Sequence, residues 1–560
     1  MLAPADPTIV YEDDDVVVVD KAVGVPTQAS DPGVPDDLPS RLRHLLATRS
    51  GLAERDVYVG THQRLDAATS GVVLYTKRRE VNAAIARELE GRHADKRYVA
   101  VVTGWQRGDA VRLEHRLAER SGGRVEVVKS SDRRGREAVT HVRVIERHAE
   151  RALVEARIET GRTHQIRVQL AAAGAPVAGD ALYGGVAAPR LMLHARSIEL
   201  AHPRTGKLLV ETEIPQELLA FVRGEEPDPF EPSTLARRLE RARELRVSFA
   251  WAARGASPTN VFRLVNEEGD ALPGLAVDVY GSWAVAQLYD DAARAAEPVV
   301  LDALASLGFD GVYVKRRPKQ SSNLGDTRKD ELAPAHAMRG ADAPGELVVR
   351  EEGMPFLVRL GDGLSTGLFL DQRDNRRRVR DLASGARVLN LFAYTCGFSL
   401  AAALGGARRT VSIDASSSAL AWGRRNFEEA GVALEGDAHR FVDADVFDAL
   451  RGLVRTRTQF DLVVLDPPTF STTRSTTWAS GTQYRELAAL VMGALAPRGR
   501  LLACSNDRRM PRAKLRRYLH EAAREAKREV TQMKDLPAQR DFPDAAGAEP
   551  HTKCLLVTLS

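Results

Sequence analysis

The chain has 560 residues, too many for a single hydrophobic core, and we expect three or four domains. Apolar residues make up 44% and charged residues 28%, an ordinary balance for a soluble, globular protein. The acidic start resembles no secretory signal, no apolar run is long enough to span a bilayer, and the three cysteines lack metal-ligand spacing. We therefore expect a cytoplasmic protein with reduced thiols, no membrane association and no metal.

Basic residues are clustered although the net charge is only +4. Three runs are strongly basic: KRRPK (residues 315–319), RDNRRRVR (residues 373–380) and KLRRYLHEAAREAKR (residues 514–528). Such runs can contact the phosphates of a nucleic acid, but a solvated helix face has the same composition. Their occurrence in several separate regions favours RNA or DNA as a partner.

The first part of the chain mixes short predicted strands with loops and few long helices. From about residue 225 an acidic, proline-rich stretch leads into a charged helix, which marks a domain boundary. In IRVQL (residues 166–170), apolar and polar residues alternate as on a half-buried strand. Strands are predicted at residues 16–20, 57–59, 72–75, 98–103, 153–158 and 166–170.

The second half begins with a central segment of short strands, one helix around residues 292–307 and a loop-like stretch at 321–344. From residue 361, apolar strands and helical segments alternate regularly, which indicates a parallel sheet with helices on both faces. We therefore expect a multidomain protein made of an α+β domain (1–225), a linker helix (226–246), a small α+β central domain (247–360) and an α/β Rossmann-like domain (361–560).

One loop of the first domain raises a chemical question. HQRLDAATSG, residues 62–71, places Arg64 and Asp66 between two predicted strands. An aspartate before small polar residues often caps a turn or a helix, but the VVLYTK that follows favours a strand over a helix. On this fragment alone, a turn cap or a surface pair with Arg64 is the better interpretation.

Four motifs in order change that interpretation: RLDAATSG, KRY, GRTHQIRV with GDALYG, and LHA with HPRTG. Over roughly residues 8–222 the chain resembles the RluA-type pseudouridine synthases, and the opening IVYEDDDVVVVDKAVGV is similar to that family's first strands. The resemblance implies that the uridine glycosidic bond is cut, the base is turned, and it is rejoined through carbon, without cofactor or metal. Two departures are Gln63, where many relatives have histidine, and DKAVG in place of NKPAG.

The same resemblance implies roles for individual residues. Asp66 matches the family aspartate that acts as nucleophile or base, and Arg167 matches the arginine that pairs with it and keeps it ionised. Tyr98 matches the aromatic residue that stacks on the flipped-out target base. The expected substrate-binding residues beside them are Arg64, His164 and Gln165.

The last domain carries acids at successive predicted strand ends. Asp414 ends the second strand, where an acid can bond ribose hydroxyls, and a small-residue turn, FAYTCGF, follows the first strand. The turn is not GxGxxG, so a dinucleotide is less expected. Asp443 and Asp445 after the third strand could reach an adenine amino group. The fourth strand delivers Asp466 and two prolines to the edge where open α/β sheets bind ligands.

This half resembles the class I S-adenosylmethionine-dependent methyltransferases, and more closely the bacterial ribosomal-RNA group. TGLFLDQRDNR, NLFAYTCGF and DPPTFS carry the match, and RLVNEEGDALPGLAVDVYG resembles that group's central domain. The resemblance implies S-adenosylmethionine as cofactor and Asp466 at the reaction. Cys396 stands where relatives usually have glycine and could crowd the methionine end slightly, but a thiol is small and we expect cofactor binding to survive. The expected cofactor-binding residues are Gln372, Arg373, Asn390, Phe392, Tyr394, Gly397, Asp414 and Asp445.

Which base is methylated depends on a cysteine. Attack by cytosine C5 normally needs a cysteine that adds to C6, and Cys504 in LLACSND is a candidate. Relatives that make 5-methylcytosine, however, place it two positions later, where this chain has Asn506, and guanine-N7 methylating relatives read S-N there. Guanine N7 has a free lone pair, so orientation does most of the work and Asp466 would stabilise the positive charge on the ring. The other expected substrate-binding residues are Pro467, Pro468, Phe470 and Asn506.

The resemblances together predict a bifunctional RNA-modifying enzyme, a pseudouridine synthase joined to a guanine-N7 methyltransferase. Large-subunit (23S) ribosomal RNA is the expected substrate, and transfer RNA is an alternative. Three rival hypotheses stay open. They are a cytosine-C5 methyltransferase, an RNA-binding assembly factor with one or both sites idle, and a methyltransferase for protein or a small molecule that uses the synthase half as an RNA tether.

Overall fold

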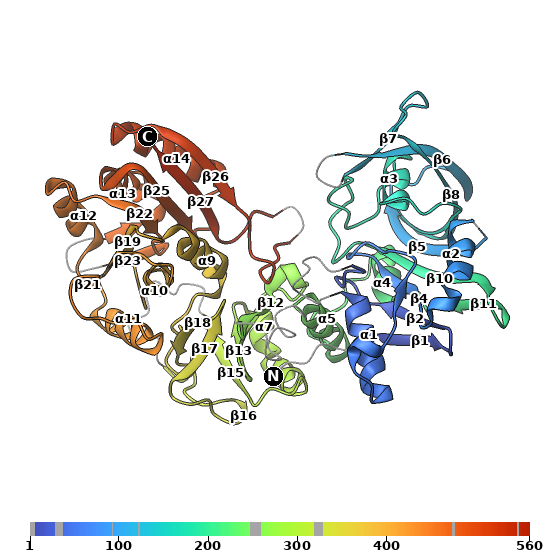
Figure 1. The fold of residues 1–560 in the computed structure, drawn as a ribbon, viewed down its shortest axis with the longest axis horizontal. Coiled ribbons are helices and arrows are strands. Elements are labelled where there is room, and N and C mark those ends of the chain that lie inside the picture. Colours follow the sequence, from blue (N-terminus) through green and yellow to red (C-terminus); the bar gives the residue numbers. More distant parts are fainter. Residues whose placement is uncertain are drawn as a thin grey trace. The chain divides into compact units, whose positions relative to one another are not determined.

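The computed structural model describes residues 6–28, 37–91, 93–120, 124–246, 259–317, 329–472, 477–545 and 548–560. The chain folds as two compact units, residues 3–251 and residues 252–560, the latter together with residues 1–2 (Figure 1). Within the described ranges, every helix is too short or too polar to cross a membrane.

The N-terminal unit is built on one large sheet. Its strands are β1 (Thr8–Glu12), β2 (Val16–Lys21), β3 (Gly60–Thr61), β4 (Ser70–Thr76), β5 (Asp95–Thr103), β6 (Ala110–Glu119), β7 (Val125–Val128), β8 (Arg136–His148), β9 (Arg151–Ile158), β10 (Leu193–His202) and β11 (Gly206–Glu211). They pair in the order β1-β2-β4-β10-β5-β9-β8-β6-β7, with β3 beside β4 and β11 beside β10. Among these described strands, β4 and β10 form the single parallel pair.

The parallel pair explains the small residues that end the RLDAATSG motif. At Gly71 the backbone is left-handed (φ +113°), and a Cβ there would lie 2.1 Å from the carbonyl oxygen of Ala195. The preceding Ser70 hydroxyl lies 2.8 Å from Nδ1 of His194. Only glycine allows β4 to begin so close to β10, and this close approach positions the loop that carries Asp66.

Helices flank this sheet: α1 (Leu38–Ser50), α2 (Asn82–Glu90), α3 (Gln165–Ala172), α4 (Gln216–Arg223) and α5 (Pro232–Leu245). Asp37 caps α1 by accepting a hydrogen bond from the Ser40 amide at 3.0 Å. The helix expected as a linker, α5, packs on this unit because Glu244 forms a buried ion pair with Arg41 of α1. It is therefore part of the N-terminal unit and not a free connection.

Two predicted strands of this half are wrong. Residues 57–59 lie outside the sheet, because the chain pairs with β4 only at Gly60 and Thr61. Residues 166–170 belong to the helix α3, which is buried on most sides, so the alternation in IRVQL carries no information about its faces. Gln169 is fully buried there, and its amide donates to the carbonyl oxygens of Leu113 and Ala138. The strands predicted at 16–20, 72–75, 98–103 and 153–158 are confirmed.

The first part of the C-terminal unit holds two small sheets. Its elements are β12 (Val261–Asn266), β13 (Leu275–Tyr280), β14 (Trp283–Leu288), α7 (Asp291–Ala295), α8 (Glu297–Ala305), β15 (Gly311–Arg316), β16 (Arg339–Gly340), β17 (Leu347–Glu351) and β18 (Met354–Val358). Strands β12 to β16 form one sheet in sequence order, and β17 pairs with β18. The single helix predicted here is two short ones, because proline in the first turn of α8 starts a new helix.

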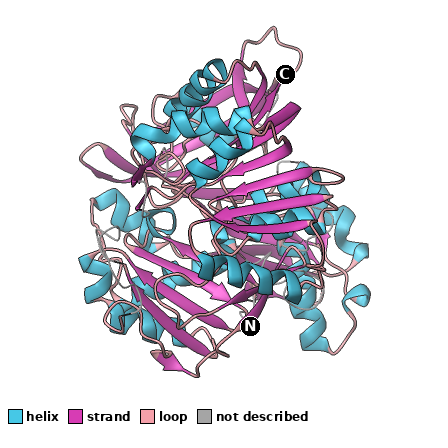
Figure 2. Cartoon of the chain, turned by 90° about the vertical axis from the view of Figure 1, so that its left-hand side faces the viewer, coloured by secondary structure: helices cyan, strands magenta, loops and turns pink. Residues whose placement is uncertain are grey.

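The rest of this unit is the predicted α/β domain. Its elements are α9 (Arg373–Leu382), β19 (Arg387–Leu391), α10 (Gly397–Leu404), β20 (Arg409–Asp414), α11 (Ser417–Glu429), β21 (His439–Asp443), α12 (Val446–Arg455), β22 (Phe460–Leu465), β23 (Phe470–Thr472), β24 (Thr477–Ala479), α13 (Ser480–Gly493), β25 (Leu495–Ser505), α14 (Arg512–Glu525), β26 (Val530–Leu536) and β27 (Lys553–Leu559). The main sheet has the order β21-β20-β19-β22-β25-β27-β26, in which the first five strands are parallel. Figure 2, which faces this unit, shows its helices packed beside the strands.

Both faces of this sheet are covered by apolar side chains. Leu389 and Val463 belong to one hydrophobic cluster, whereas their strand neighbours Val388 and Val464 belong to another. Successive residues of a strand point to opposite faces, so the two clusters lie on opposite sides of the sheet. The predicted Rossmann-like arrangement is confirmed, and its parallel strands direct their carboxyl ends to one edge.

Candidate active sites

The N-terminal unit has a cavity of about 800 Å³ in which Asp66 meets Arg167. Nη1 of Arg167 donates to Oδ2 of Asp66 at 2.8 Å, and the other edge of the guanidinium donates to both carboxylate oxygens of Asp180 at 2.7 and 2.9 Å. Burial disfavours the charge of Arg167, but the hydrogen bonds to Asp180 and Asp66 outweigh it and raise its pKa above the ordinary value. Arg167 is thus held rigidly against the Asp66 carboxylate.

Tyr98 and His164 flank this ion pair. Burial and the nearby charge of Asp66 raise the pKa of Tyr98, so its phenol stays protonated at neutral pH. Nε2 of His164 lies 3.6 Å from Oδ2 of Asp66, and Nδ1 lies 2.9 Å from the hydroxyl of Tyr183. Burial lowers the pKa of His164 despite the pull of Asp66, so a neutral imidazole faces the cavity.

The other residues predicted for this site also line the cavity, in different ways. Arg64 is exposed at its surface. Gln165 is buried, and its amide is bonded within the protein: Nε2 donates to the carbonyl oxygen of Val139 at 3.0 Å, and Oε1 accepts from Thr160 at 2.7 Å. Arg64 is free to meet a ligand, whereas Gln165 shapes the wall.

Sequence reasoning missed two charged residues that support Asp66. One is Asp180 of the GDALYG motif, which anchors Arg167. The other is Lys21, whose fully buried Nζ donates to the carbonyl oxygens of Ala22, Val25 and Ala67 at 2.9–3.0 Å. Burial lowers the pKa of Lys21 to about 7. The available signal was the presence of charged residues inside otherwise apolar motifs, namely DKAVG and APVAGDALYG.

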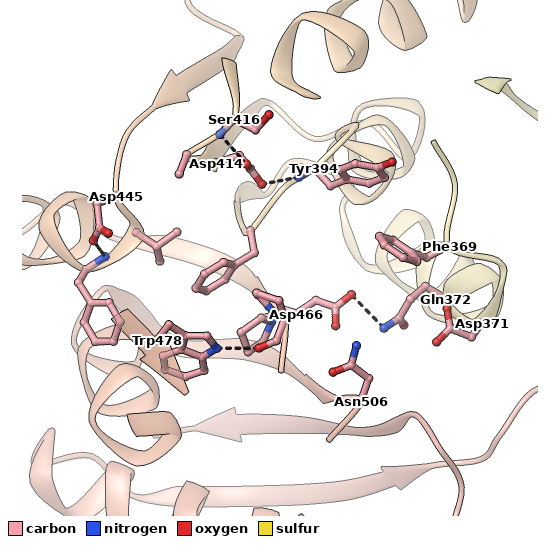
Figure 3. Close-up of a pocket in the computed structure, with 16 residues that line it drawn as sticks. Phe369, Asp371, Gln372, Tyr394, Asp414, Ser416, Asp445, Asp466, Trp478 and Asn506 are labelled. Carbon is pink, nitrogen blue, oxygen red and sulfur yellow. Dashed lines mark hydrogen bonds between the residues drawn. The ribbon is translucent and has the colours of Figure 1, made fainter. Parts of the chain in front are cut away.

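The C-terminal unit has a second cavity, of about 410 Å³, at the carboxyl edge of the parallel sheet (Figure 3). Asp414 at the end of β20 accepts hydrogen bonds at 2.8 Å from the amides of Tyr394 and Ser416. Burial raises the pKa of Asp414. Asp445 caps α12 by accepting from the Phe447 amide at 2.9 Å. The two carboxylates are positioned by backbone groups at neighbouring strand ends.

Asp466 lies at the centre of this cavity. Its Oδ2 accepts a hydrogen bond from Nε2 of Gln372 at 3.0 Å. Burial and the charge of Asp371 raise the pKa of Asp466 to about 7. At neutral pH this carboxyl group therefore changes its protonation easily.

The walls around Asp466 come from several segments of the chain. Pro467 and Pro468 line the cavity, and the indole of Trp478 donates to the carbonyl oxygen of Pro468 at 2.6 Å. Oδ1 of Asn506 accepts from the hydroxyl of Thr469 at 2.9 Å. Phe392, Tyr394 and Gln372, all predicted at this site, line the cavity too.

Phe369, which sequence reasoning did not single out, is 53% exposed beside the cavity with its ring 5.2 Å from that of Tyr394. It lies in the TGLFLDQR motif, so the motif was the signal although the residue was not chosen.

Three residues predicted to bind the cofactor lie outside the cavity lining. Nδ2 of Asn390 donates to the Ser399 hydroxyl at 3.0 Å and so ties β19 to α10. Arg373 is buried and bonded through both terminal nitrogens to Asp541, at 2.6 and 2.9 Å. Gly397 packs against the Arg376 side chain. These residues shape the domain, and the side chain of Phe470 lies outside the described residues.

The two cysteines discussed for this domain are buried and absent from the described cavity lining, although Sγ of Cys504 lies 3.9 Å from Oε1 of Gln372, which does line the cavity. Cys396 is buried with a left-handed backbone (φ +61°), and its sulfur faces Gly423 of α11. Cys396 is therefore absent from the described cavity lining, and its slight crowding of the methionine end stays a prediction. Cys504 on β25 is buried with its sulfur 3.0 Å from that of Cys554, and burial raises the pKa of its thiol. Among the described residues that line the cavity, none is a cysteine.

Part of the first two basic runs is used inside the fold, whereas Arg517 and Arg524 of the third run, on α14, are exposed. Arg373 and Arg376 of the second run form buried ion pairs with Asp541 and Glu351. Lys315 of the first run is buried, with Nζ donating to the carbonyl oxygen of Leu360 at 2.6 Å, whereas residues 318–319 lie outside the described residues. In the described parts of the chain, no three His, Cys, Asp or Glu side chains gather as a metal site.

Comparison with known proteins matches each half to a family. Residues 15–172 match the model of RNA pseudouridylate synthases, and residues 339–557 match the model of S-adenosylmethionine-dependent methyltransferases. Ribosomal RNA large subunit methyltransferase I of Erwinia tasmaniensis is 33% identical over 308 residues, which are 55% of this chain and 75% of that protein. The enzyme of the same name from Aeromonas salmonicida is 32% identical over 50% of this chain and 70% of that protein.

Among solved structures, the methyltransferase SMU.776 complexed with SAH matches with a TM-score of 0.52 and 24% identity, over 65% of this chain and 88% of that one. This likeness concerns the fold. The second cavity fits the cofactor of the matched family, because Asp414 can bond ribose hydroxyls and aromatic walls can hold a purine. A cavity with several carboxylates also suits a positively charged sulfonium.

Proposed function

The chain belongs to the ribosomal RNA large subunit methyltransferase family and carries an RNA pseudouridylate synthase domain, and we propose that it catalyses two reactions on large-subunit ribosomal RNA. The N-terminal unit converts a uridine to pseudouridine. The C-terminal unit transfers a methyl group to N7 of a guanine.

The first reaction is supported by the ion pair between Asp66 and Arg167 in a cavity that Tyr98 also lines. A uridine flipped out of the RNA would stack on the Tyr98 ring and present its glycosidic bond to the Asp66 carboxylate. The bond between C1′ and N1 breaks, a bond between C1′ and C5 forms, C5 gives up its proton to a base, and the ring nitrogen freed from the ribose takes up a proton, so that the product is an isomer of uridine. Because the phenol of Tyr98 stays protonated, the proton acceptor is another group, and Asp66 is the nearest candidate.

In the second cavity, S-adenosylmethionine would supply an activated methyl group to the attacking base. Asp414 would hold its ribose and Asp445 its adenine amino group, from the edge of the sheet. Asp466 would face the target base with Asn506 and the two prolines beside it. A guanine gains positive charge as N7 takes the methyl group, and the Asp466 carboxylate stabilises that charge.

Guanine N7 is favoured over cytosine C5 by one observation. Methylation at C5 needs a thiol that adds to the ring, and the described lining of the cavity offers an amide, Asn506, instead. Cys504 is turned toward Cys554, and burial keeps its thiol protonated. N7 has a lone pair of its own, so positioning beside the methyl group is sufficient.

The test uses the purified full chain, unmodified large-subunit ribosomal RNA and S-adenosylmethionine, with nucleoside mass spectrometry as the readout. We expect both pseudouridine and 7-methylguanosine. 5-Methylcytosine would overturn the N7 assignment, and products formed only on transfer RNA would overturn the substrate. RNA binding without any product would favour the assembly-factor hypothesis. Methyl transfer to protein after RNase treatment would favour the tether hypothesis.

A further inference from the structure

Lys96 lies in the wall of the N-terminal cavity and takes no part in the chemistry described above. It belongs to β5, between β9 and β10, and it pairs in register with Ile158 and Ile198. Side chains two apart on a strand share a face, so Lys96 and Tyr98 both point into the cavity. Their Cα atoms are about 6.8 Å apart, since a strand advances about 3.4 Å per residue.

The ammonium group of Lys96 has no partner in the part of the chain that the structure describes. Among the described residues it makes no hydrogen bond and no ion pair. Burial lowers the pKa of Lys96, and no neighbouring carboxylate counters this effect. Two buried cations near this site differ, since Arg167 is held by two aspartates and Lys21 by three carbonyl groups. Arg64, which also lines the cavity, is exposed to solvent, whereas Lys96 is half-buried. A half-buried cation without a partner is costly unless a ligand supplies the negative charge.

The space beside this ammonium group is open. The loop of the GRTHQ motif passes Lys96 at Gly161, where an added Cβ would lie 3.8 Å from Nζ. Two acids line this cavity with Lys96 besides Asp66: Glu159, which is bonded to His141 at 2.6 Å, and Glu90, and neither acts measurably on the charge of Lys96. An anion could therefore approach Nζ from the cavity without displacing an existing contact.

We propose that Lys96 binds a phosphate of the RNA backbone next to the target uridine. The assignment rests on the proposed pseudouridine synthase reaction, in which the flipped uracil lies on Tyr98. The backbone that carries this base must then pass along the same face of β5, within reach of a long lysine side chain. Lys96 is a binding residue in this assignment, and it touches neither the uracil nor the glycosidic bond.

The test compares Lys96→Met and Lys96→Arg in the full chain. Lys207→Met is the matched control, because it removes the same charge from an exposed lysine paired with Glu199 outside the cavity. For Lys96→Met we expect RNA affinity to fall about tenfold at 0.1 M salt, and the slope of log K against log salt to shrink by about 0.7 to 1. The turnover number at saturating RNA stays within about threefold of wild type. In Lys96→Arg the RNA affinity should return to near the wild-type value, and in Lys207→Met the affinity and the salt slope should both equal those of wild type.

A phosphate-by-phosphate substitution locates the contact. Uridine oligonucleotides carrying one neutral methylphosphonate at a time are titrated against wild type and Lys96→Met. Neutralising one phosphate next to the target uridine should weaken binding to wild type and leave binding to Lys96→Met unchanged. Such coupling is expected of two groups in contact. Unchanged affinity and slope in Lys96→Met would overturn the assignment. A lost turnover number with an unchanged slope would also overturn it, since Lys96 would then act on the reaction.

Failure of the proposed function gives a different result. If the wild-type chain makes no pseudouridine on any RNA, the catalytic proposal fails. The salt slope and the methylphosphonate coupling still report whether Lys96 binds a phosphate. A folding defect is recognised separately by the thermal melting of each variant.

Discussion

The two cavities each contain a central aspartate, but the protein treats these two aspartates in opposite ways. Asp66 meets the guanidinium of Arg167 at 2.8 Å, and Asp180 holds that guanidinium in place. Among the described residues, the hydrogen-bond partner of Asp466 is the neutral amide of Gln372 at 3.0 Å, and burial raises the pKa of Asp466 to about 7. The first cavity contains its own counter-charge, whereas the second leaves a buried acid to be matched by a cation from the ligand. A sulfonium cofactor and a base that becomes positive on methylation both supply such a charge.

The largest effect should come from removing the paired aspartate. In Asp66→Ala, we expect pseudouridine formation to fall by about 10⁴-fold or more, because no other carboxylate can replace the reacting group. RNA affinity and methyl transfer should remain near wild type. Nucleoside mass spectrometry and filter binding measure these outcomes, with Asp132→Ala on an exposed loop as the control. Pseudouridine at the wild-type level in Asp66→Ala would remove Asp66 from the chemistry.

The second largest effect should come from the residue that holds Arg167. Asp180→Ala leaves Nε and Nη2 of the guanidinium without their acceptors, so the side chain can rotate away from Asp66. We expect kcat for pseudouridine to fall about 10²-fold to 10³-fold while KM for RNA changes little. Asp180→Asn keeps one acceptor and should recover part of the rate. If the loss appears in KM alone, Asp180 is not a positioning residue.

The site around Asp66, Arg167 and Asp180 shows what the sequence could and could not predict. Asp66 and Arg167 were found by motif, but the strand assigned to Arg167 was wrong, since α3 is buried on most sides and its alternation does not report a solvent face. The contact of Asp180 with Arg167 depends on how the loop after α3 folds back, which no local pattern encodes.

The α/β half was more predictable, because long apolar strands ending in acids specify both the sheet and its ligand edge. Within the same motifs, however, sequence reasoning could not separate residues that line the cavity from those that support it. Gln372 lines the cavity, whereas its neighbour Arg373 points to Asp541, because the pair Arg373–Asp541 joins segments far apart in the chain. Such long-range ion pairs appear only when the fold is known.

The third prediction uses Asp466, the acid without a cationic partner. In Asp466→Asn, we expect methyl transfer to fall about 10²-fold, because the charge facing the base is lost, with pseudouridine formation unchanged. The free energy of unfolding should rise in the same variant, although its methyl-transfer rate falls. Since the folded pKa is raised from 3.8 to about 7, the carboxyl group's stabilising contribution is complete below pH 3.8 and is lost as the pH rises toward 7.

The melting temperature of Asp466→Asn should therefore exceed that of wild type at pH 8, and the difference should be smaller at pH 5.5. Thermal melting of the cofactor-free protein at both pH values measures this difference. An equal gain at both would mean that Asp466 does not titrate in this window.

The fourth prediction follows the same group through pH. In wild type, kcat/KM for methyl transfer should rise about tenfold between pH 6 and pH 8, because the fraction of ionised Asp466 rises through its pKa of about 7. Pseudouridine formation, whose aspartate is paired with Arg167, serves as the internal reference in the same samples. In Asp466→Asn the rise should vanish. A rise that persists in this variant would place the titrating group elsewhere.

The smallest effect should come from Cys504, and it decides between the two candidate bases. Cys504→Ala should leave methyl transfer within about twofold of wild type, since the thiol faces Cys554 and lies outside the cavity lining. Loss of a buried side-chain atom should lower stability by about 1 kcal/mol. Asn506→Ala, which alters a residue of the cavity wall close by on the chain, should lower methyl transfer more than Cys504→Ala does. If methylation disappears in Cys504→Ala while the protein stays folded, the cysteine must reach the base and cytosine C5 replaces guanine N7 as the target.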